Sequence, residues 1–246
     1  MTVQLQPSLK LSLLSLVLLC YSCSDDICSE TVCSNNGTVV QSDGQCSCDC
    51  SETLYTGEQC DISDPSKVQG LLDAGSTPLD LLNDGVPVDS FYGKEYQGGL
   101  IFYIDTDTGT GLVAAKEDQG LNIMWGCQSS VIDGADGEAV GSGQQNTLDI
   151  IAGCNETEIA AKLCQDFILD SYEDWFLPSK DELTLMYSNL HQNNHGDFIM
   201  TQYWSSTEAP GFGLAWVRDF GLGIEFMNSK DASLFSFVGV RAVRVF

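Results

Sequence analysis

Six cysteines between residues 28 and 60 are the strongest constraint on how this chain can fold: Cys28, Cys33, Cys46, Cys48, Cys50 and Cys60. The segment has too few apolar residues to form a core of its own, so covalent bridges have to hold it together. Six cysteines allow fifteen pairings, and the sequence leaves these open. A zinc site is the alternative, but no histidine is near and an oxidising exterior favours disulfides.

The first residues are typical of an export signal. Lys10 precedes an apolar run over residues 11–19, which is too short to cross a bilayer and fits the hydrophobic part of a signal peptide. We therefore expect residues 1–22 to be a signal peptide.

The residues that follow resemble a bacterial lipoprotein signal, in which a small residue precedes the acylated cysteine. Ser22 precedes Cys23, and the run from Ser24 to Asp26 resembles the acidic export tag of surface lipoproteins in the Bacteroidota. The resemblance implies a lipid anchor at Cys23, an acidic tether over 23–27 and display on the outer membrane. Cys20 stands where such signals usually carry an aliphatic or small residue, so a secreted protein is the alternative.

The charge of the chain restricts its partners. It has 35 acidic and 10 basic residues, a formal net charge of −25. Such a field repels nucleic acid, sulfated polysaccharide and anionic lipid head groups. We therefore expect no nucleic-acid partner and disfavour sulfated polysaccharides, which leaves neutral glycans and proteins.

Residues 28–60 resemble an EGF-like module. The features that carry the resemblance are the Asn35-Asn-Gly-Thr38 turn, the Cys46-Ser-Cys48 step and the closing run from Tyr55 to Cys60. The resemblance implies a disulfide-linked spacer or stalk.

Residues 61–93 read as a lead-in of short helices. Pro78 and Pro87 suit the first position of a helix, and Gly75 and Gly85 suit the residue after a helix end. We expect these turns to pack against the domain that follows, residues 94–246.

The centre of that domain is a junction between a strand and a helix. Trp175-Phe-Leu177 is apolar, Pro178 cannot continue a sheet, and Ser179 with Glu182 forms a capping box. The apolar spacing that follows predicts a helix over residues 180–190.

Strands flank the helices on both sides. A hairpin is expected over residues 98–115, one helix near Asn146 and another from Glu156 to Leu169. The last third reads as strands that end with a single strand over Val238–Val245. An α+β fold follows, with an antiparallel sheet and two or three helices.

Several motifs together resemble one domain family, that of the C-terminus of the Legionella collagen-like adhesin, with its sister, the Fibrobacter succinogenes major-paralogue domain. The resemblance covers roughly residues 90–246 and implies a C-type-lectin-like fold with adhesion or glycan binding. The motifs are Tyr96-Gln-Gly-Gly-Leu-Ile-Phe-Tyr103, Gly111-Leu-Val-Ala-Ala115, Trp125-Gly126, Asp174-Trp-Phe-Leu-Pro-Ser-Lys-Asp-Glu-Leu183, Tyr203-Trp-Ser-Ser-Thr-Glu208, Ala215-Trp-Val217 and Val240-Arg-Ala-Val-Arg244.

The tryptophans could either stack on a sugar or fill the core. Trp175 and Trp216 lie inside apolar motifs and are expected in the core. Trp125 and Trp204 precede glycine-rich or acidic loops and are, with Glu208, the candidate ligand-binding residues.

Two acidic loops make calcium a possible cofactor, and the sequence indicates no other. Carboxylates two or three positions apart suit this ion, although neither loop completes an EF-hand and Asp-Gly tracts are mostly turns. The candidate ligands are Asp105, Asp107, Asp133, Asp136 and Glu138.

Three cysteines remain in the large domain. We expect Cys127 to pair with Cys154, because both lie in predicted loops, and Cys164 to stay free on a helix. A buried free cysteine is inert, and no base or metal-ligand set accompanies Cys164.

The sequence therefore predicts a surface lipoprotein with a non-catalytic binding function, adhesion to a neutral glycan or a surface protein. The expected contact loops are Ser205–Phe212 and Asp133–Gly143. One alternative is an architectural envelope protein without a tight ligand. The other is a cysteine-dependent oxidase built on Cys164.

Overall fold

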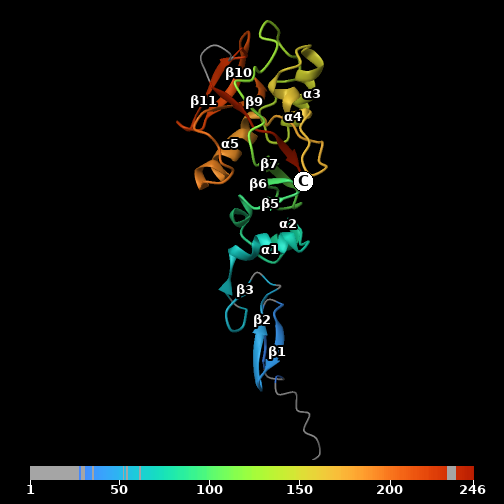
Figure 1. Ribbon diagram of the computed structural model, residues 1–246, viewed down its shortest axis with the longest axis vertical. Coiled ribbons are helices and arrows are strands. Elements are labelled where there is room, and N and C mark those ends of the chain that lie inside the picture. The colour runs from blue at the N-terminus through green and yellow to red at the C-terminus, as the bar shows by residue number, and fades with distance from the viewer. Residues whose placement is uncertain are drawn as a thin grey trace, which may run out of the picture.

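The computed structural model describes residues 28, 31–34, 36–51, 53, 55–60, 62–231 and 237–246. The predicted signal peptide, Cys23 and the acidic tether lie outside these residues. Figure 1 shows an elongated molecule, with the cysteine-rich module at one end, α1 and α2 in the middle and the large domain at the other end. No helix in the described part is long and apolar enough to cross a membrane.

The cysteine-rich module is a short hairpin held by three disulfides. Asp43 and Gly44 both have positive φ at the two-residue turn, as a type I′ hairpin turn requires. Its strands are β1 (Thr38–Ser42), β2 (Gln45–Asp49), β3 (Tyr55–Thr56) and β4 (Ile62–Ser63). The disulfides are Cys28–Cys46, Cys33–Cys48 and Cys50–Cys60. The cysteines thus pair first with third, second with fourth and fifth with sixth.

The lead-in helices belong to the core of the large domain. They are η1 (Pro65–Lys67), α1 (Val68–Asp73), α2 (Pro78–Asn83) and η2 (Val88–Phe91). Thr77 and Asp80 form a capping box around Pro78, which occupies the first helical position. Val68 and Phe91 are fully buried and join the main hydrophobic cluster.

Hydrogen bonds connect the cysteine-rich module to these helices. The Lys67 ammonium donates to the carbonyl oxygens of Cys50 and Tyr55, and the Tyr55 hydroxyl donates to the carbonyl of Asp84.

Two sheets form the large domain. One contains β11 (Ile224–Ser229), β10 (Leu214–Asp219), β9 (Gln202–Glu208), β12 (Val238–Val240) and β8 (Gly120–Leu121), in that spatial order. The other contains β13 (Val243–Val245), β7 (Gly111–Ala114), β6 (Gly99–Ile104) and β5 (Glu95–Tyr96). The β6–β7 hairpin is where the sequence predicts it.

The expectation of one terminal strand over Val238–Val245 is wrong. The chain leaves the first sheet after β12, passes through Arg241 and Ala242, and enters the second sheet as β13. Arg241 lies at this break, and its buried guanidinium donates to Asp118 and to the Ala115 carbonyl. The first sheet is also not purely antiparallel, since β12 pairs with β9 in parallel.

Three helices cover the sheets: α3 (Gly143–Gly153), α4 (Ala160–Gln165) and α5 (Lys180–Asn189). Ser179 and Glu182 form the predicted capping box at the start of α5. The second predicted helix is much shorter than Glu156–Leu169. Its apolar tail leaves α4 after Gln165 and lines a cavity instead of continuing the helix.

The junction before α5 connects both sheets. Phe176 bridges to Val243 of β13, and the Pro178 carbonyl accepts a hydrogen bond from the Ser206 amide of β9. The Trp175 indole is buried and donates to the Tyr172 carbonyl. The motif that resembles the lectin-like family thus has a scaffold role.

Candidate functional site

Two of the loops selected from the sequence meet around one cavity, which we call the loop cleft. It encloses about 570 Å³. One wall comes from residues 131–138 and the other from Glu208–Phe212, the loop after β9. The lining residues are Val131, Ile132, Asp133, Gly134, Asp136, Glu138, Glu208, Ala209, Pro210, Gly211 and Phe212.

Hydrogen bonds hold the two walls in register. The Ile132 amide donates to the Glu208 carboxylate at 2.6 Å, and the Glu208 amide donates to the Ala135 carbonyl at 2.7 Å. The Thr207 hydroxyl donates to the Gly137 carbonyl. The cleft is therefore preformed, as small-ligand sites usually are.

A buried carboxylate, that of Glu182, holds the chain just after the first wall of the cleft, residues 131–138, in place. Glu182 accepts hydrogen bonds from the Ser179 and Gly141 amides, so the helix cap of α5 also anchors the chain before α3. Burial raises the pKa of the Glu182 carboxyl. This residue positions the loop and does not face a ligand.

Glu208 lies in the cleft wall, but its carboxylate is already occupied. It pairs with the Lys230 ammonium at 2.5 Å, and both side chains are almost fully buried. Lys230 also donates to the Ser130 carbonyl and lies 4.4 Å from the centre of the Trp125 ring. Each oxygen of the Glu208 carboxylate thus already accepts a hydrogen bond within the fold, and the role of Glu208 in ligand binding stays a prediction.

The structure places the other two candidates, Trp125 and Trp204, in the core. Both side chains are fully buried, and their indole N–H groups donate to the carbonyls of Ser205 and Ile123. Trp175 is in the core as expected. Trp216 is instead half-buried, with the Lys180 ammonium 4.1 Å from its ring centre.

The aromatic side chain that the cleft does present is Phe212, which is 71% exposed. Sequence reasoning selected its loop but not this residue. The available signal was an apolar ring within a Pro210-Gly-Phe-Gly213 turn, where no core position is expected.

The proposed calcium ligands do not come together. The Asp105 carboxylate accepts hydrogen bonds from the Asp107 and Thr108 amides, which makes this loop an Asx turn. Glu138 pairs with Lys180 at 2.8 Å. In the described ranges, no three of the five candidate carboxylates lie within 4.8 Å of one another.

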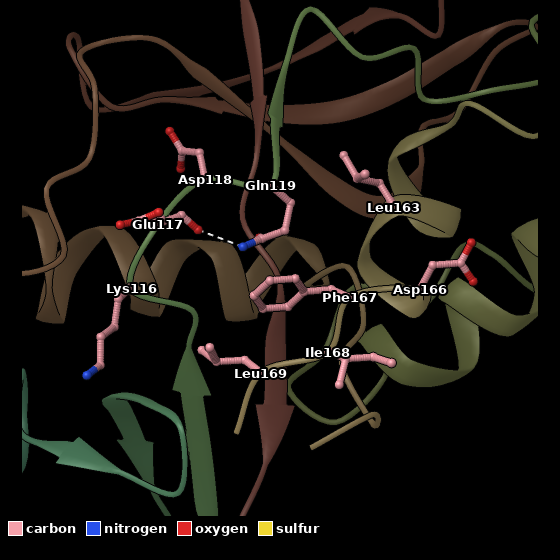
Figure 2. A pocket seen from close by; sticks show the side chains of 9 residues that line it. All are labelled: Lys116, Glu117, Asp118, Gln119, Leu163, Asp166, Phe167, Ile168 and Leu169. Carbon is pink, nitrogen blue, oxygen red and sulfur yellow. Dashed lines mark hydrogen bonds between the residues drawn. The ribbon is translucent and has the colours of Figure 1, made fainter. Parts of the chain in front are cut away.

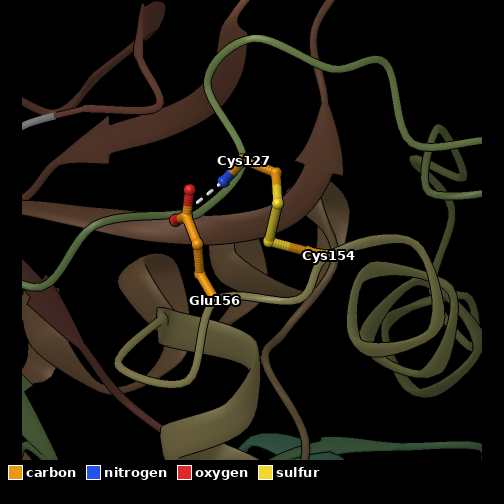
Figure 3. A group of neighbouring side chains, drawn as sticks. All are labelled: Cys127, Cys154 and Glu156. Carbon is orange, nitrogen blue, oxygen red and sulfur yellow. Dashed lines mark hydrogen bonds between the residues drawn. A yellow bond between two sulfur atoms is a disulfide. The ribbon is translucent and has the colours of Figure 1, made fainter.

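A different group of potential ligand atoms does gather, as Figure 3 shows. The Sγ atoms of Cys127 and Cys154 and a carboxylate oxygen of Glu156 all lie within 4.8 Å of one another. The two sulfur atoms form a disulfide, the pairing that the sequence favours. Glu156 accepts a hydrogen bond from the Cys127 amide at 3.0 Å, so it fixes the loop.

Cys164 is the free cysteine of the described residues and is fully buried in α4. Burial strongly raises the pKa of its thiol. The reactive thiolate form is therefore suppressed at neutral pH.

Sequence reasoning missed a second cavity, of about 560 Å³, shown in Figure 2. It lies between the segment Lys116–Gln119 and the chain that follows α4. The apolar run Phe167–Leu169 is the sequence feature that indicates this cavity, but its spacing also fits the longer helix that the sequence predicts. The other lining residues are Leu163 and Asp166.

Comparison with known proteins identifies the N-terminal module. A family model described as the SPE-9 third EGF-like domain matches residues 22–64. The disulfide order found there is the usual EGF connectivity. This part of the chain is an EGF-like domain. None of the curated proteins matches the chain.

Proposed function

We propose that this chain is a non-catalytic binding protein of the cell exterior and that the loop cleft holds its ligand. The observation that carries the proposal is the cleft itself. Two loops that are far apart in the sequence enclose about 570 Å³. The exposed Phe212 ring and two exposed carboxylates, Asp133 and Asp136, line this cavity. An EGF-like domain is an extracellular type of module, which agrees with this setting.

The ligand class is a glycan or a surface protein. An exposed aromatic ring suits stacking on either, and the net charge of −25 opposes polyanions. The C-type-lectin-like resemblance of residues 94–246 supports adhesion by analogy. We also propose that Cys23 carries a lipid anchor on the outer membrane, with the EGF-like domain as a stalk.

The experiment is a binding screen of the full chain against neutral glycans and extracellular proteins. Phe212→Ala is expected to weaken binding at least about tenfold, a usual effect for an aromatic contact at the centre of an interface. Leu222→Ala is the matched control, because Leu222 is 72% exposed but lies in the turn between β10 and β11. Equal binding by both variants would remove the cleft as the site.

The architectural alternative makes a different prediction. A protein that serves only as an envelope component would retain no glycan or protein in this screen, with or without Phe212.

A further inference from the structure

We propose that the second cavity, which we call the α4 pocket, binds a small organic cation with an apolar body. This inference is independent of the loop cleft. The pocket is lined by Lys116–Gln119, Leu163 and Asp166–Leu169, and its volume of about 560 Å³ lies in the range of small-molecule sites.

The floor of the pocket is apolar because α4 ends early. After Gln165 the chain turns away from the helix, so Ile168 is left 60% exposed. The Phe167 ring packs on Trp175 with ring centres 5.3 Å apart, which holds it in place. Figure 2 shows this ring between the Gln119 side chain and the side chains of Ile168 and Leu169. The floor thus offers a rigid aromatic surface to an apolar group.

The charged side chains that line the pocket are paired with one exception. Lys116 pairs with Glu95, Asp166 with Lys162, and Asp118 with the buried Arg241. The Glu117 carboxylate has no cationic partner within the part of the chain that the structure describes. The lining residues and their ion-pair partners therefore carry a net charge of minus one.

Glu117 stands at the rim. Figure 2 shows its carboxylate on the side away from Phe167. The side chain is exposed, and exposed side chains exchange rotamers within nanoseconds, so it can turn toward a bound cation.

The pocket also lacks groups that would hold an anion. The Gln119 amide nitrogen donates to the Glu117 carbonyl, and its oxygen accepts from the Ala242 amide. Arg241 is 1% exposed and is held by Asp118 at the back of the wall. Selection for a monocation follows from the one uncompensated carboxylate and the absence of a free lining cation among the described residues.

The test is calorimetric titration of the full chain with three probes of similar shape: phenethylammonium, phenethyl alcohol and 3-phenylpropionate. The ammonium is expected to bind about two- to fivefold more tightly than the alcohol, within the range of one exposed ion pair. The carboxylate is expected to bind more weakly than both.

Two variants separate the parts of the proposal. Glu117→Gln should abolish the preference for the ammonium and leave alcohol binding unchanged. Ile168→Arg should block binding of the ammonium and of the alcohol, whereas Leu222→Arg, at another exposed apolar site, should change neither. Absence of binding by all probes, or unchanged ammonium preference in Glu117→Gln, would overturn the proposal. These outcomes do not depend on Phe212 or the loop cleft.

Discussion

Glu208 and Lys230 form an ion pair at 2.5 Å inside the large domain, with exposed side-chain fractions of 6% and 0%. Glu208 ends β9, and Lys230 follows β11, so the pair ties two strand ends together. Glu208 also lines the loop cleft. Attraction within a buried pair offsets the cost of desolvation only when further hydrogen bonds stabilise the charges, and here the Ser130 carbonyl accepts from Lys230 and the Ile132 amide donates to Glu208.

Removal of the Glu208 charge should therefore destabilise the fold strongly. Glu208→Gln leaves the Lys230 ammonium buried without a counter-charge, which is expected to lower the free energy of unfolding by about 3 kcal/mol. Urea unfolding monitored by fluorescence measures this. Glu138→Gln is the control, because its ion pair with Lys180 is half-exposed on the Glu side and should be worth under about 1 kcal/mol. Equal effects would contradict a special role of the buried pair.

The Asp174–Arg244 pair predicts a specific response to acid. The Nε and Nη2 atoms of the Arg244 guanidinium donate to the Asp174 carboxylate, and these bonds lower the pKa of Asp174 below its ordinary value of 3.8. A lowered folded-state pKa contributes stability above the unfolded value and loses it as pH falls through the folded value. Because Asp174 is half-exposed, we expect less than about 1 kcal/mol.

Urea midpoints of the wild-type protein and Asp174→Asn between pH 2 and 6 test this prediction. The wild-type protein should be more stable near pH 6, and the difference should vanish at the acid end. A difference that persists unchanged at pH 2 would show that the charge is not its cause.

Cys164 should resist modification in the native protein. Its thiol is buried and its pKa is raised, so iodoacetamide at pH 8 should not label it until the chain unfolds. Mass spectrometry before and after denaturant measures the labelling. Fast labelling of the native protein would instead support a cysteine-dependent enzyme.

Calcium should leave thermal stability unchanged. The five carboxylates proposed from the sequence gather in no group of three across the described residues, and Asp105 and Glu138 have other partners. A ligand that binds the native state alone must raise the unfolding midpoint. We expect the same midpoint, within about one degree, in calcium and in chelator. A clear rise would restore these loops as a metal site.

Local sequence rules predicted the features that depend on neighbouring residues. The capping box of Ser179 and Glu182 and the hairpin of β6 and β7 are confirmed, because caps and alternation act over a few positions. The same rules failed for α4. Its apolar spacing continues to Leu169, but the side chains beyond Gln165 find their contacts outside the helix.

The burial of the binding candidates could not be predicted for a related reason. Trp125 is buried because its indole meets the Ser205 carbonyl, 80 positions away in the chain, and nothing near Trp125 in the sequence reports that contact. In the same way, Glu208 forms a buried ion pair with Lys230, which lies 22 positions later in the chain. Phe212 is the exposed ring of the cleft, as its fractional exposure of 71% shows.

The sequence by itself determined the cysteine-rich module, the α+β class and the helix start at Ser179, since disulfide density, periodicity and capping are local properties. Only the tertiary structure decided which cysteines pair between residues 28 and 60, where the last strand changes sheets at Arg241, and which loops meet in a cleft. These outcomes depend on buried hydrogen bonds and ion pairs between residues that are far apart in the sequence. Such contacts stabilise the chain only after folding has brought the residues together.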